Sequence, residues 1–288
     1  MRETETMHRA LGAVQCKGNQ RGPVRRVSSS EITAVDRIAE WDEQDFFRRY
    51  MKPSRPVILT AAMDSWPALR SWSLDHLQSK FGDRRVTVGK TRAGHLVTQR
   101  VGGVPQSEMT LGAFIESLRG GDPGCYLLSP IDERVPELLA DVRFDELAPS
   151  ASWRSTRMWM SAKDTVSALH HDLPENFLAQ VMGRKRITLI HRRHTRNVYR
   201  NSLLHGAPNF CAVDAEDPDF ERFPRFRRVE PITIELAAGE VLYIPRLWWH
   251  HVRSLDVSIS VNQWFARGAL AIAARGSQLF ARVRGLRR

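Results

Sequence analysis

The sequence predicts a mainly β fold with helical decoration, on three observations. From Met158 onward, short apolar and alternating runs dominate, as expected of strands. Before Val142 the pattern is mixed, with helix start and stop residues around apolar-periodic segments. The 288 residues are enough to bury a sizeable core, and no internal repeat divides them. We therefore expect a single domain with an all-β core.

The N-terminal part of this domain is predicted to contain α and β elements. Ser73 can cap one helix and Gly82 can end it, while Thr110 precedes another. Together with the apolar pattern, these residues predict helices over 41–50, 73–81 and 111–118, and a strand over 56–59.

A β-hairpin is predicted where Gly183-Arg184 separates two strand-like runs, since such a two-residue turn demands a positive backbone angle. In the second run, Lys185 alternates onto the same side as Ile187 and Leu189, an otherwise apolar face. A lysine there needs an anion or a route to solvent, because an unpaired buried ammonium is costly. The alternative is a lysine at a strand start that reaches solvent along its own stem.

Two separated histidine motifs indicate chemistry: His170-His171-Asp172 and, further along, Trp248-Trp249-His250-His251. In an extended strand, residues i and i+2 share a face, so His170 and Asp172 can share a metal while His171 faces away. Two imidazoles and one carboxylate are the ligands of non-haem Fe(II) oxygenases, because this set leaves three coordination positions open. The alternative for the first motif is a set of ordinary polar strand residues.

The second motif follows a glycine turn, a short apolar strand and a proline, within residues 239–251. Proline cannot continue a central ladder, so we expect the strand to end where the aromatic and histidine residues begin. At a barrel rim, such a break could aim His250 inward while the indoles of Trp248 and Trp249 exclude water. The alternative is that these three residues are simply core.

The longer segments around these motifs resemble the Jumonji-C, cupin-like 2-oxoglutarate oxygenases. The segments are LHHDLPENFLAQVMGRKRITLI, AAGEVLYIPRLWWHHV, VSISVNQWF, RPVILTAAMDSWPA and FERFPRF. The likeness is greatest to the subgroup that includes the asparaginyl hydroxylase inhibiting hypoxia-inducible factor. It runs from about Ser30 to Phe265 and implies a double-stranded β-helix, the cupin or jelly-roll core, over about 156–266.

Carried over by position, the resemblance makes His170, Asp172 and His250 the iron ligands. His250 is preferred to His251 because it directly follows the tryptophan pair. Lys185 matches the family lysine that pairs with the distal carboxylate of 2-oxoglutarate. The other residues expected around this cosubstrate are Tyr126, Ser167, Asn176, Asn262 and Trp264.

Two of these candidates have support in the sequence. Ser167 keeps a hydroxyl donor where the family commonly carries threonine. Within 257–264, apolar residues occupy one face, and Asn262 and Trp264 share the other face with two serines. The polar face is expected to line the barrel lumen. The alternative is a half-exposed sheet whose polar residues face solvent.

The resemblance implies a dioxygenase that uses Fe(II), 2-oxoglutarate and O₂, and releases succinate and CO₂. We expect it to hydroxylate a protein or peptide side chain, and prefer hydroxylation to demethylation because no histone-reading module accompanies the domain. A small molecule or a transfer RNA is the alternative substrate, and the net charge of +11 leaves RNA open. A different class is a non-oxygenase cupin module or a Zn(II) site, in which Lys185 and the asparagines would have no role.

The rest of the chain suggests its compartment and partners. Cys16, Cys125 and Cys211 are separated and odd in number, which favours a reducing, cytoplasmic compartment. No apolar run is long enough for a membrane span. Residues 1–30 are expected to be a disordered basic lead before a catalytic domain over 31–266. Residues 267–288 should form a basic helix that could make a homodimer, or could lie on a nucleic acid or a membrane.

The connection over 191–231 is long for a compact domain, which usually indicates function or disorder. One interpretation is that this basic insert borders the substrate channel and binds acidic groups. The alternative is a solvated run of surface charge. Its first part contains His191, Arg192, Arg193, His194, Arg196 and Arg200.

Overall fold

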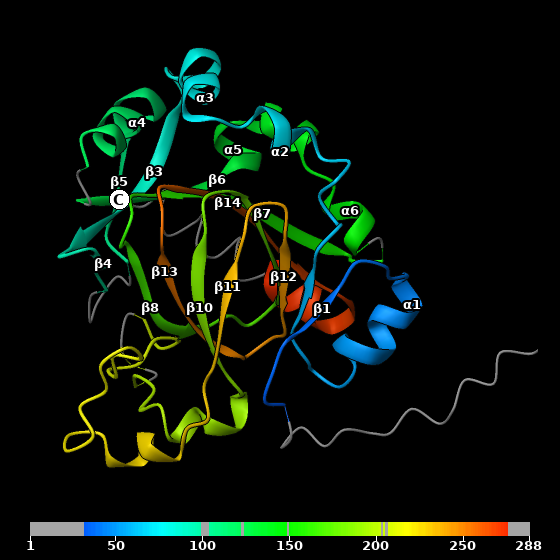
Figure 1. Ribbon diagram of the computed structural model, residues 1–288, viewed down its shortest axis with the longest axis vertical. Helices are drawn as coiled ribbons and strands as arrows, with labels where there is room; N and C mark the ends of the chain where they lie inside the picture. Colours follow the sequence, from blue (N-terminus) through cyan, green and yellow to red (C-terminus); the bar gives the residue numbers. More distant parts are fainter. Residues whose placement is uncertain are drawn as a thin grey trace, which may run out of the picture.

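The computed structural model describes residues 32–98, 104–121, 124–148, 150–202, 204 and 207–275. Within these residues, strands build the body of the protein and short helices flank them (Figure 1). The strands are β1 (Asp36–Ile38), β2 (Val57–Leu59), β3 (Arg85–Arg92), β4 (His95–Leu96), β5 (Gln106–Thr110), β6 (Cys125–Pro130), β7 (Trp153–Ser161), β8 (Val166–His171), β9 (Glu175–Met182), β10 (Lys185–Ile190), β11 (Ile232–Leu236), β12 (Val241–Ile244), β13 (Trp249–Ser254) and β14 (Ser258–Ala266).

Most helical segments precede the long strands of the core. They are α1 (Glu43–Phe46), the π-helical η1 (Phe47–Met51), α2 (Pro67–Ser71), α3 (Leu74–Phe81), α4 (Leu111–Arg119), α5 (Ile131–Arg134), the 3₁₀ helix η2 (Pro136–Asp141) and α6 (Phe144–Leu147). Two further 3₁₀ helices, η3 (Arg192–Arg196) and η4 (Pro224–Arg228), lie in the long insert.

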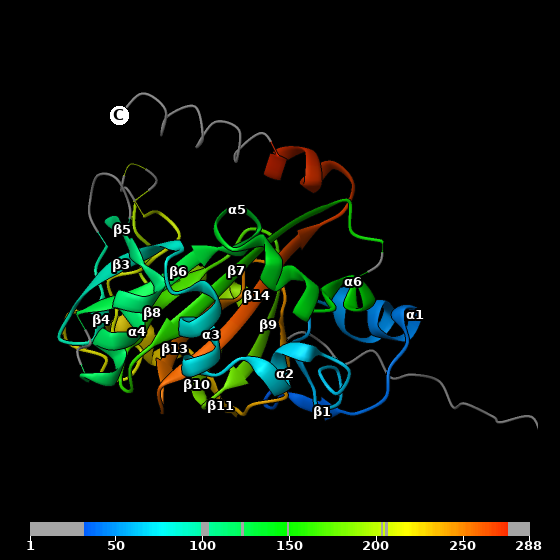
Figure 2. The same cartoon turned by 90° about the horizontal axis from the view of Figure 1, so that it is seen from above.

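The strands form two layers joined through β3 and β4. The first layer has the order β1-β2-β12-β9-β14-β7-β6-β3, with β5 also paired to β3; the second has the order β4-β8-β13-β10-β11. Figure 2 shows β14 running between β7 and β9, its two antiparallel partners. This arrangement confirms the expected mainly β, jelly-roll architecture.

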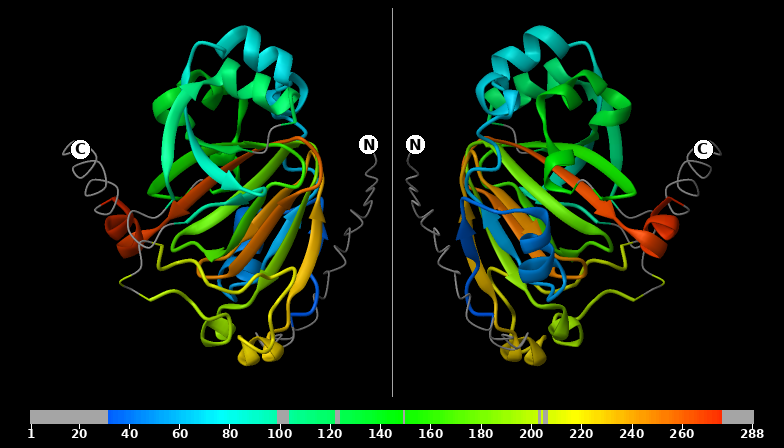
Figure 3. Two further views of the ribbon diagram at one scale, coloured as in Figure 1. Left: turned by 90° about the vertical axis from the view of Figure 1, so that its left-hand side faces the viewer. Right: turned by 90° about the vertical axis from the view of Figure 1, so that its right-hand side faces the viewer.

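Apolar side chains form four clusters in the described residues, of which the smallest comprises Leu96, Tyr126 and Leu128. The first core packs the helices on the outer face of the first strand layer, for example Phe114 near Met158 and Val261. The second lies between the strand layers and includes Leu178 and Ile187. The third joins the insert to the second layer. Figure 3 shows the helical region at one end of the strands and the insert at the other.

The helix caps predicted from the sequence are confirmed. The Ser73 hydroxyl accepts from the backbone N–H of His76 at 3.1 Å, and the Thr110 hydroxyl accepts from that of Ala113 at 3.2 Å. The helix expected over 41–50 starts two residues later and is split into α1 and η1. The strand expected over 56–59 is β2. The strands and short helices over 85–92 and 125–147 were not expected.

The predicted hairpin around Gly183-Arg184 is wrong. Gly183 has the expected positive φ of 72°, and a Cβ there would lie 2.4 Å from the Val257 carbonyl oxygen. However, β9 pairs with β12 and β14, whereas β10 pairs with β11 and β13. Both edges of β9 are therefore occupied, and the turn carries the chain from one strand layer to the other.

The long insert over 191–231 is packed rather than loose. Val198, Phe223 and Phe226 form a buried cluster with outward-facing residues of the second strand layer, among them Ile190 and Trp249. The insert is consequently held on the second strand layer by buried apolar residues, and its charged side chains extend from this packed segment.

The predicted terminal segments are only partly described. The helix expected over 267–288 is observed from Gly268 to Arg275, and the remainder lies outside the described residues, as does the predicted lead over 1–30. Cys125 and Cys211 are both partly buried, and Cys16 also lies outside the described residues. Among the described residues, no helix combines the length and apolarity needed to span a membrane.

Candidate active site

The two histidine motifs meet as neighbouring strands. β8 and β13 pair antiparallel so that His170 lies opposite His250, and their ring centroids are 4.1 Å apart. The next pair, His171 and Trp249, makes an edge contact at 4.7 Å on the outer face. Strand alternation therefore separates the inward histidines from their outward neighbours, as the sequence predicted.

Asp172 follows β8 directly and completes a three-residue cluster. Its Oδ2 atom lies 3.6 Å from Nε2 of His250. One potential ligand atom each from His170, Asp172 and His250 fit within 4.8 Å of one another. Two imidazoles and a carboxylate at this separation can hold one metal ion.

Backbone carbonyls orient both imidazoles. Nδ1 of His170 lies 2.8 Å from the Ala168 carbonyl oxygen, and Nδ1 of His250 lies 3.1 Å from that of Trp248. An Nδ1–H donated to these acceptors leaves each Nε2 lone pair free to bind metal. Removal from water lowers the pKa of His170 to about 4 and also lowers that of His250, so both rings are neutral near pH 7.

A hydrogen-bonded relay holds the carboxylate of Asp172. Its Oδ2 accepts from Nε1 of Trp264 at 2.8 Å and from Nδ2 of Asn176 at 3.1 Å. Asn262 donates to Asn176 at 2.9 Å, and Trp159 donates to Asn262 at 2.6 Å. Each amide thus accepts from one neighbour and donates to the next, which fixes the orientation of the carboxylate.

The cluster lies in the wall of a cavity with about 410 Å³ of empty space. All nine residues predicted for the site line this cavity, and they come from β6, β8, β9, β10, β13, β14 and the turn after β8. Apolar side chains from β9, β12 and β13 complete the wall. The full lining is Tyr126, Trp159, Ser167, His170, Asp172, Asn176, Leu178, Lys185, Ile244, His250, Val252, Asn262 and Trp264.

Lys185 is buried in this wall with its charge uncompensated. The side chain is 1% exposed, as its alternation with Ile187 and Leu189 predicted. Among the described residues, the polar contacts of Nζ are with Tyr126, 3.5 Å from its hydroxyl and 5.8 Å from its ring centre. Burial lowers the pKa of Lys185 to about 7 and raises the pKa of Tyr126. This end of the cavity can accommodate an anion, which would favour the protonated form of the Lys185 side chain.

Ser167 faces the same cavity as His170 although the two are three residues apart. The register of β8 against β13 shifts between His250 and Val252, where three residues of β8 oppose two of β13. Such a β-bulge inserts one residue and re-aims the side chains beyond it. Simple alternation would have placed Ser167 on the opposite face.

Three residues around the site were not foreseen. Trp159 lines the cavity from β7, where it alternates with the core residues Met158 and Met160. Phe210, from the insert, stacks on His170 with ring centroids 4.9 Å apart. Glu175 is the third. Alternation in β7 was the available signal for Trp159, whereas nothing local pointed to Phe210.

Glu175 fastens the turn that leads to His250. Its Oε2 accepts from the hydroxyl of Tyr243 at 2.7 Å and from the backbone N–H of Arg246 at 2.9 Å. The next N–H, of Leu247, donates to the Asp172 carbonyl at 2.8 Å. Leu247 has a φ of 64°, an uncommon value for a residue with a side chain, so neighbouring contacts must hold it.

Comparison with known proteins identifies the type of domain. The family model of the cupin-like domain matches residues 43–269. A protein of Xenopus tropicalis named lysine-specific demethylase 8 is 33% identical over 245 residues, which are 81% of this chain and 53% of that protein. The lysine-specific demethylase JMJ30 of Arabidopsis thaliana is 32% identical over 234 residues, 78% of this chain and 53% of that protein.

A human relative is matched over most of its length. The bifunctional peptidase and (3S)-lysyl hydroxylase JMJD7 is 28% identical over 255 residues, 76% of this chain and 80% of that protein. By contrast, the chain spans about half the length of the two demethylases. The extent of the domain match shows that the chain belongs to the cupin-like JmjC family of Fe(II)- and 2-oxoglutarate-dependent oxygenases.

Proposed function

We propose that the protein is an Fe(II)- and 2-oxoglutarate-dependent dioxygenase that hydroxylates a side chain of a protein or peptide. The observation that carries this proposal is one cavity with two different ends. One end has a cluster of two neutral imidazoles and a carboxylate, and the other has a buried lysine with no acidic partner in the part of the chain that the structure describes. A metal ion would bind the cluster at the first end, and a dicarboxylate would supply the counter-charge for the lysine at the second.

In this proposal, His170 and His250 bind Fe(II) through Nε2, and Asp172 binds it through a carboxylate oxygen. The carbonyls of Ala168 and Trp248 keep the two rings in the required tautomer. The three protein ligands leave coordination positions for 2-oxoglutarate and O₂.

Lys185 binds the distal carboxylate of 2-oxoglutarate, with the hydroxyls of Tyr126 and Ser167 as further donors. A charge-assisted contact with a carboxylate would compensate the ammonium that burial now disfavours. Asn176 and Trp264 hold Asp172 in place, and Asn262 in turn orients Asn176. A zinc site or a plain binding module would leave the burial of Lys185 without a reason.

When bound, Fe(II) and 2-oxoglutarate supply oxidation by O₂: one oxygen atom enters succinate as CO₂ leaves, and the other enters the substrate C–H bond as hydroxyl. The chain positions the reactants and excludes water. The indole of Trp159 and the apolar side chains of Leu178, Ile244 and Val252 wall the cavity for this purpose.

The names of the relatives favour a lysine-bearing protein as substrate. Two are named for demethylation of lysine and one for lysyl hydroxylation. A hydroxylase and a demethylase of this type share the same first step, insertion of oxygen into a C–H bond. We therefore propose a protein side chain as the target, with hydroxylation as the simplest outcome.

Anaerobic titration with Fe(II) and then with 2-oxoglutarate tests the proposed site. We expect one Fe(II) per chain and a visible charge-transfer band when the cosubstrate is added. Lysine peptides, free amino acids and transfer RNA are then screened for stimulated succinate release and for a mass gain of one oxygen atom. Tight Zn(II) binding without 2-oxoglutarate binding would reject the oxygenase, and stimulation by RNA alone would reject the protein substrate.

A further inference from the structure

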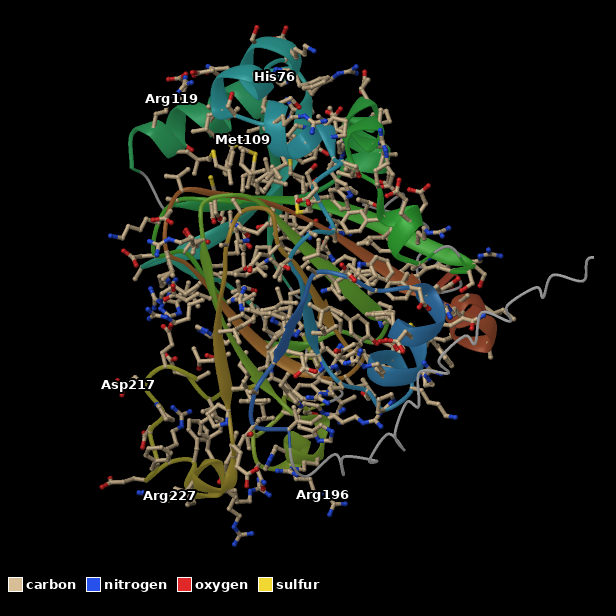
Figure 4. The ribbon with its side chains drawn as sticks, turned by 45° about the vertical axis from the view of Figure 1, so that its right-hand side comes forward. His76, Met109, Arg119, Arg196, Asp217 and Arg227 are labelled. Atoms are coloured by element: carbon tan, nitrogen blue, oxygen red, sulfur yellow. The ribbon has the colours of Figure 1, made fainter. Side chains whose placement is uncertain are left out.

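The insert carries six exposed arginines on its two 3₁₀ helices, η3 and η4. We call this set the arginine ridge: Arg192, Arg193, Arg196, Arg225, Arg227 and Arg228. Figure 4 labels Arg196 and Arg227 at the end of the molecule that the insert forms.

Contacts within the insert hold η4 against the segment that follows η3. The backbone N–H of Arg225 donates to the hydroxyl of Tyr199 at 3.0 Å, and its guanidinium lies 4.3 Å from the Tyr199 ring centre. The guanidinium of Arg227 lies 4.6 Å from the ring centre of Phe220. Beneath the ridge, Phe223 and Phe226 belong to the buried cluster that anchors the insert. The backbone that carries the arginines is therefore anchored, and two of the six guanidinium groups also contact aromatic rings.

The positive charge of the ridge is largely uncompensated. Across the parts of the chain that the structure describes, Arg193 makes a salt bridge, with Glu230, and the other five arginines make none. The five arginines without a salt bridge carry like charges that repel one another. An anionic partner on this surface would remove the repulsion.

The ridge belongs to the same end of the strands as the metal-ligand cluster. Thr195, in η3, accepts a hydrogen bond from the indole N–H of Trp249 at 3.1 Å, one residue before His250. The backbone N–H of His171 donates to the Asn209 carbonyl at 3.0 Å, and Phe210 stacks on His170.

The exposure of the cavity residues shows which end is open. Lys185 is 1% and Tyr126 4% exposed, whereas the side chain of Asp172 is 13% exposed. His170 and Trp264 are also only partly buried. The cavity thus opens on the side of His170 and Asp172, where Phe210 of the insert stacks on His170.

We propose that the arginine ridge is a docking surface for an acidic segment of the protein substrate, whose target side chain then enters the cavity beside it. This inference rests on the proposed function, in which the substrate is a protein. Guanidinium groups suit carboxylates because they can donate two parallel hydrogen bonds to each.

An acidic peptide fits this surface better than a nucleic acid. The same insert contains five carboxylates between Asp214 and Glu221, and Figure 4 shows Asp217 on the same side of the molecule as Arg227. A nucleic acid carries a charge at every phosphate, so a strand that extends beyond the ridge would meet these carboxylates. A short acidic segment can end where the arginines end.

The test measures binding of a fluorescein-labelled decaglutamate peptide to the full chain by anisotropy at low salt, without metal or cosubstrate. The ridge variant combines Arg196→Gln, Arg227→Gln and Arg228→Gln. The control variant combines Arg70→Gln, Lys80→Gln and Arg92→Gln, which removes the same charge from exposed positions outside the insert. We expect about tenfold weaker binding for the ridge variant and less than twofold for the control.

A third variant, with lysine at the same three ridge positions, separates charge from folding. It should retain most of the peptide affinity, and circular dichroism should show all variants folded. Equal weakening by the ridge and control variants would overturn the proposal, as would tighter binding of a ten-nucleotide RNA than of the peptide. Because turnover is not measured, failure of the oxygenase assignment would leave this result standing.

Discussion

The two ends of the cavity differ in the partners that the chain itself provides for their polar groups. At the metal-ligand end, each Nδ1 has a carbonyl partner and Asp172 accepts two hydrogen bonds. At the other end, the partner of Lys185 among the described residues is Tyr126, through a long contact with its hydroxyl and a contact with its ring. The three side chains of the first end already have hydrogen-bond partners that orient them, and the ammonium of the second end lacks a counter-charge.

This difference shows where the protein is organised in advance and where it depends on a ligand. The orientation of His170, Asp172 and His250 is fixed by the chain itself, so binding of a metal requires little rearrangement. The charge of Lys185 instead depends on what enters the cavity. Variants at the first end should therefore change metal binding, and those at the second should change cosubstrate binding and its dependence on pH.

The largest effect is expected from Asp172→Ala. This change removes the one anionic ligand of the cluster, and we expect Fe(II) affinity to fall by more than about a hundredfold with loss of turnover. Anaerobic equilibrium dialysis measures the affinity directly. Asp217→Ala removes an exposed carboxylate of the insert and serves as the control. Full iron binding by Asp172→Ala would remove this residue from the ligand set.

Lys185→Met should affect the other end selectively. Loss of the ammonium should weaken 2-oxoglutarate binding by about a hundredfold, as when one partner of a buried charge pair is removed. Fe(II) affinity should stay within about twofold, because Lys185 contacts none of the three ligands. Calorimetric titration of both ligands against the wild type and Lys80→Met separates the effects. Equal loss of both affinities would show that the ends are not independent.

Trp264→Phe tests the relay that holds Asp172. Without the indole N–H, the carboxylate loses one of its two donors, and Fe(II) affinity should fall by about tenfold. Trp159→Phe is the matched control, since Trp159 donates to Asn262, which is separated from Asp172 by Asn176, and its contact with Trp264 is an edge contact between rings that a phenylalanine can keep. A larger effect of Trp159→Phe on iron binding would contradict the relay.

The pH dependence of the protein without ligands should report on Lys185. Its pKa is about 7 when folded, below the ordinary 10.5, so the unfolded chain binds more protons between these values. The contribution of Lys185 to the free energy of unfolding should then increase as pH rises from 7 to about 10.5. Urea titrations of wild type and Lys185→Met measure this difference, and parallel pH profiles would show that Lys185 does not titrate there.

Titration of Lys185 should also affect the binding of 2-oxoglutarate. Above pH 7 the ammonium must be re-formed to pair with a carboxylate, so 2-oxoglutarate binding should take up a proton. Its affinity should fall by up to about tenfold for each pH unit above 7, and this slope should be absent in Lys185→Met.

Local sequence patterns determined several features of this protein. The i, i+2 spacing placed His170 and Asp172 on one face, and alternation put Lys185 with the buried Ile187 and Leu189. The caps at Ser73 and Thr110 were also predicted correctly. Each of these features depends on the geometry of a single strand or helix turn, which neighbouring residues specify.

Tertiary structure decided the features that join distant segments. The turn at Gly183 was predicted, but pairing of β9 with β12 and β14 excluded the hairpin. A bulge against β13 brought Ser167 into the cavity, and packing of the insert set Phe210 on His170. Strand partners, register and bulges depend on which edges remain free after the whole sheet has formed, and no local pattern encodes that choice.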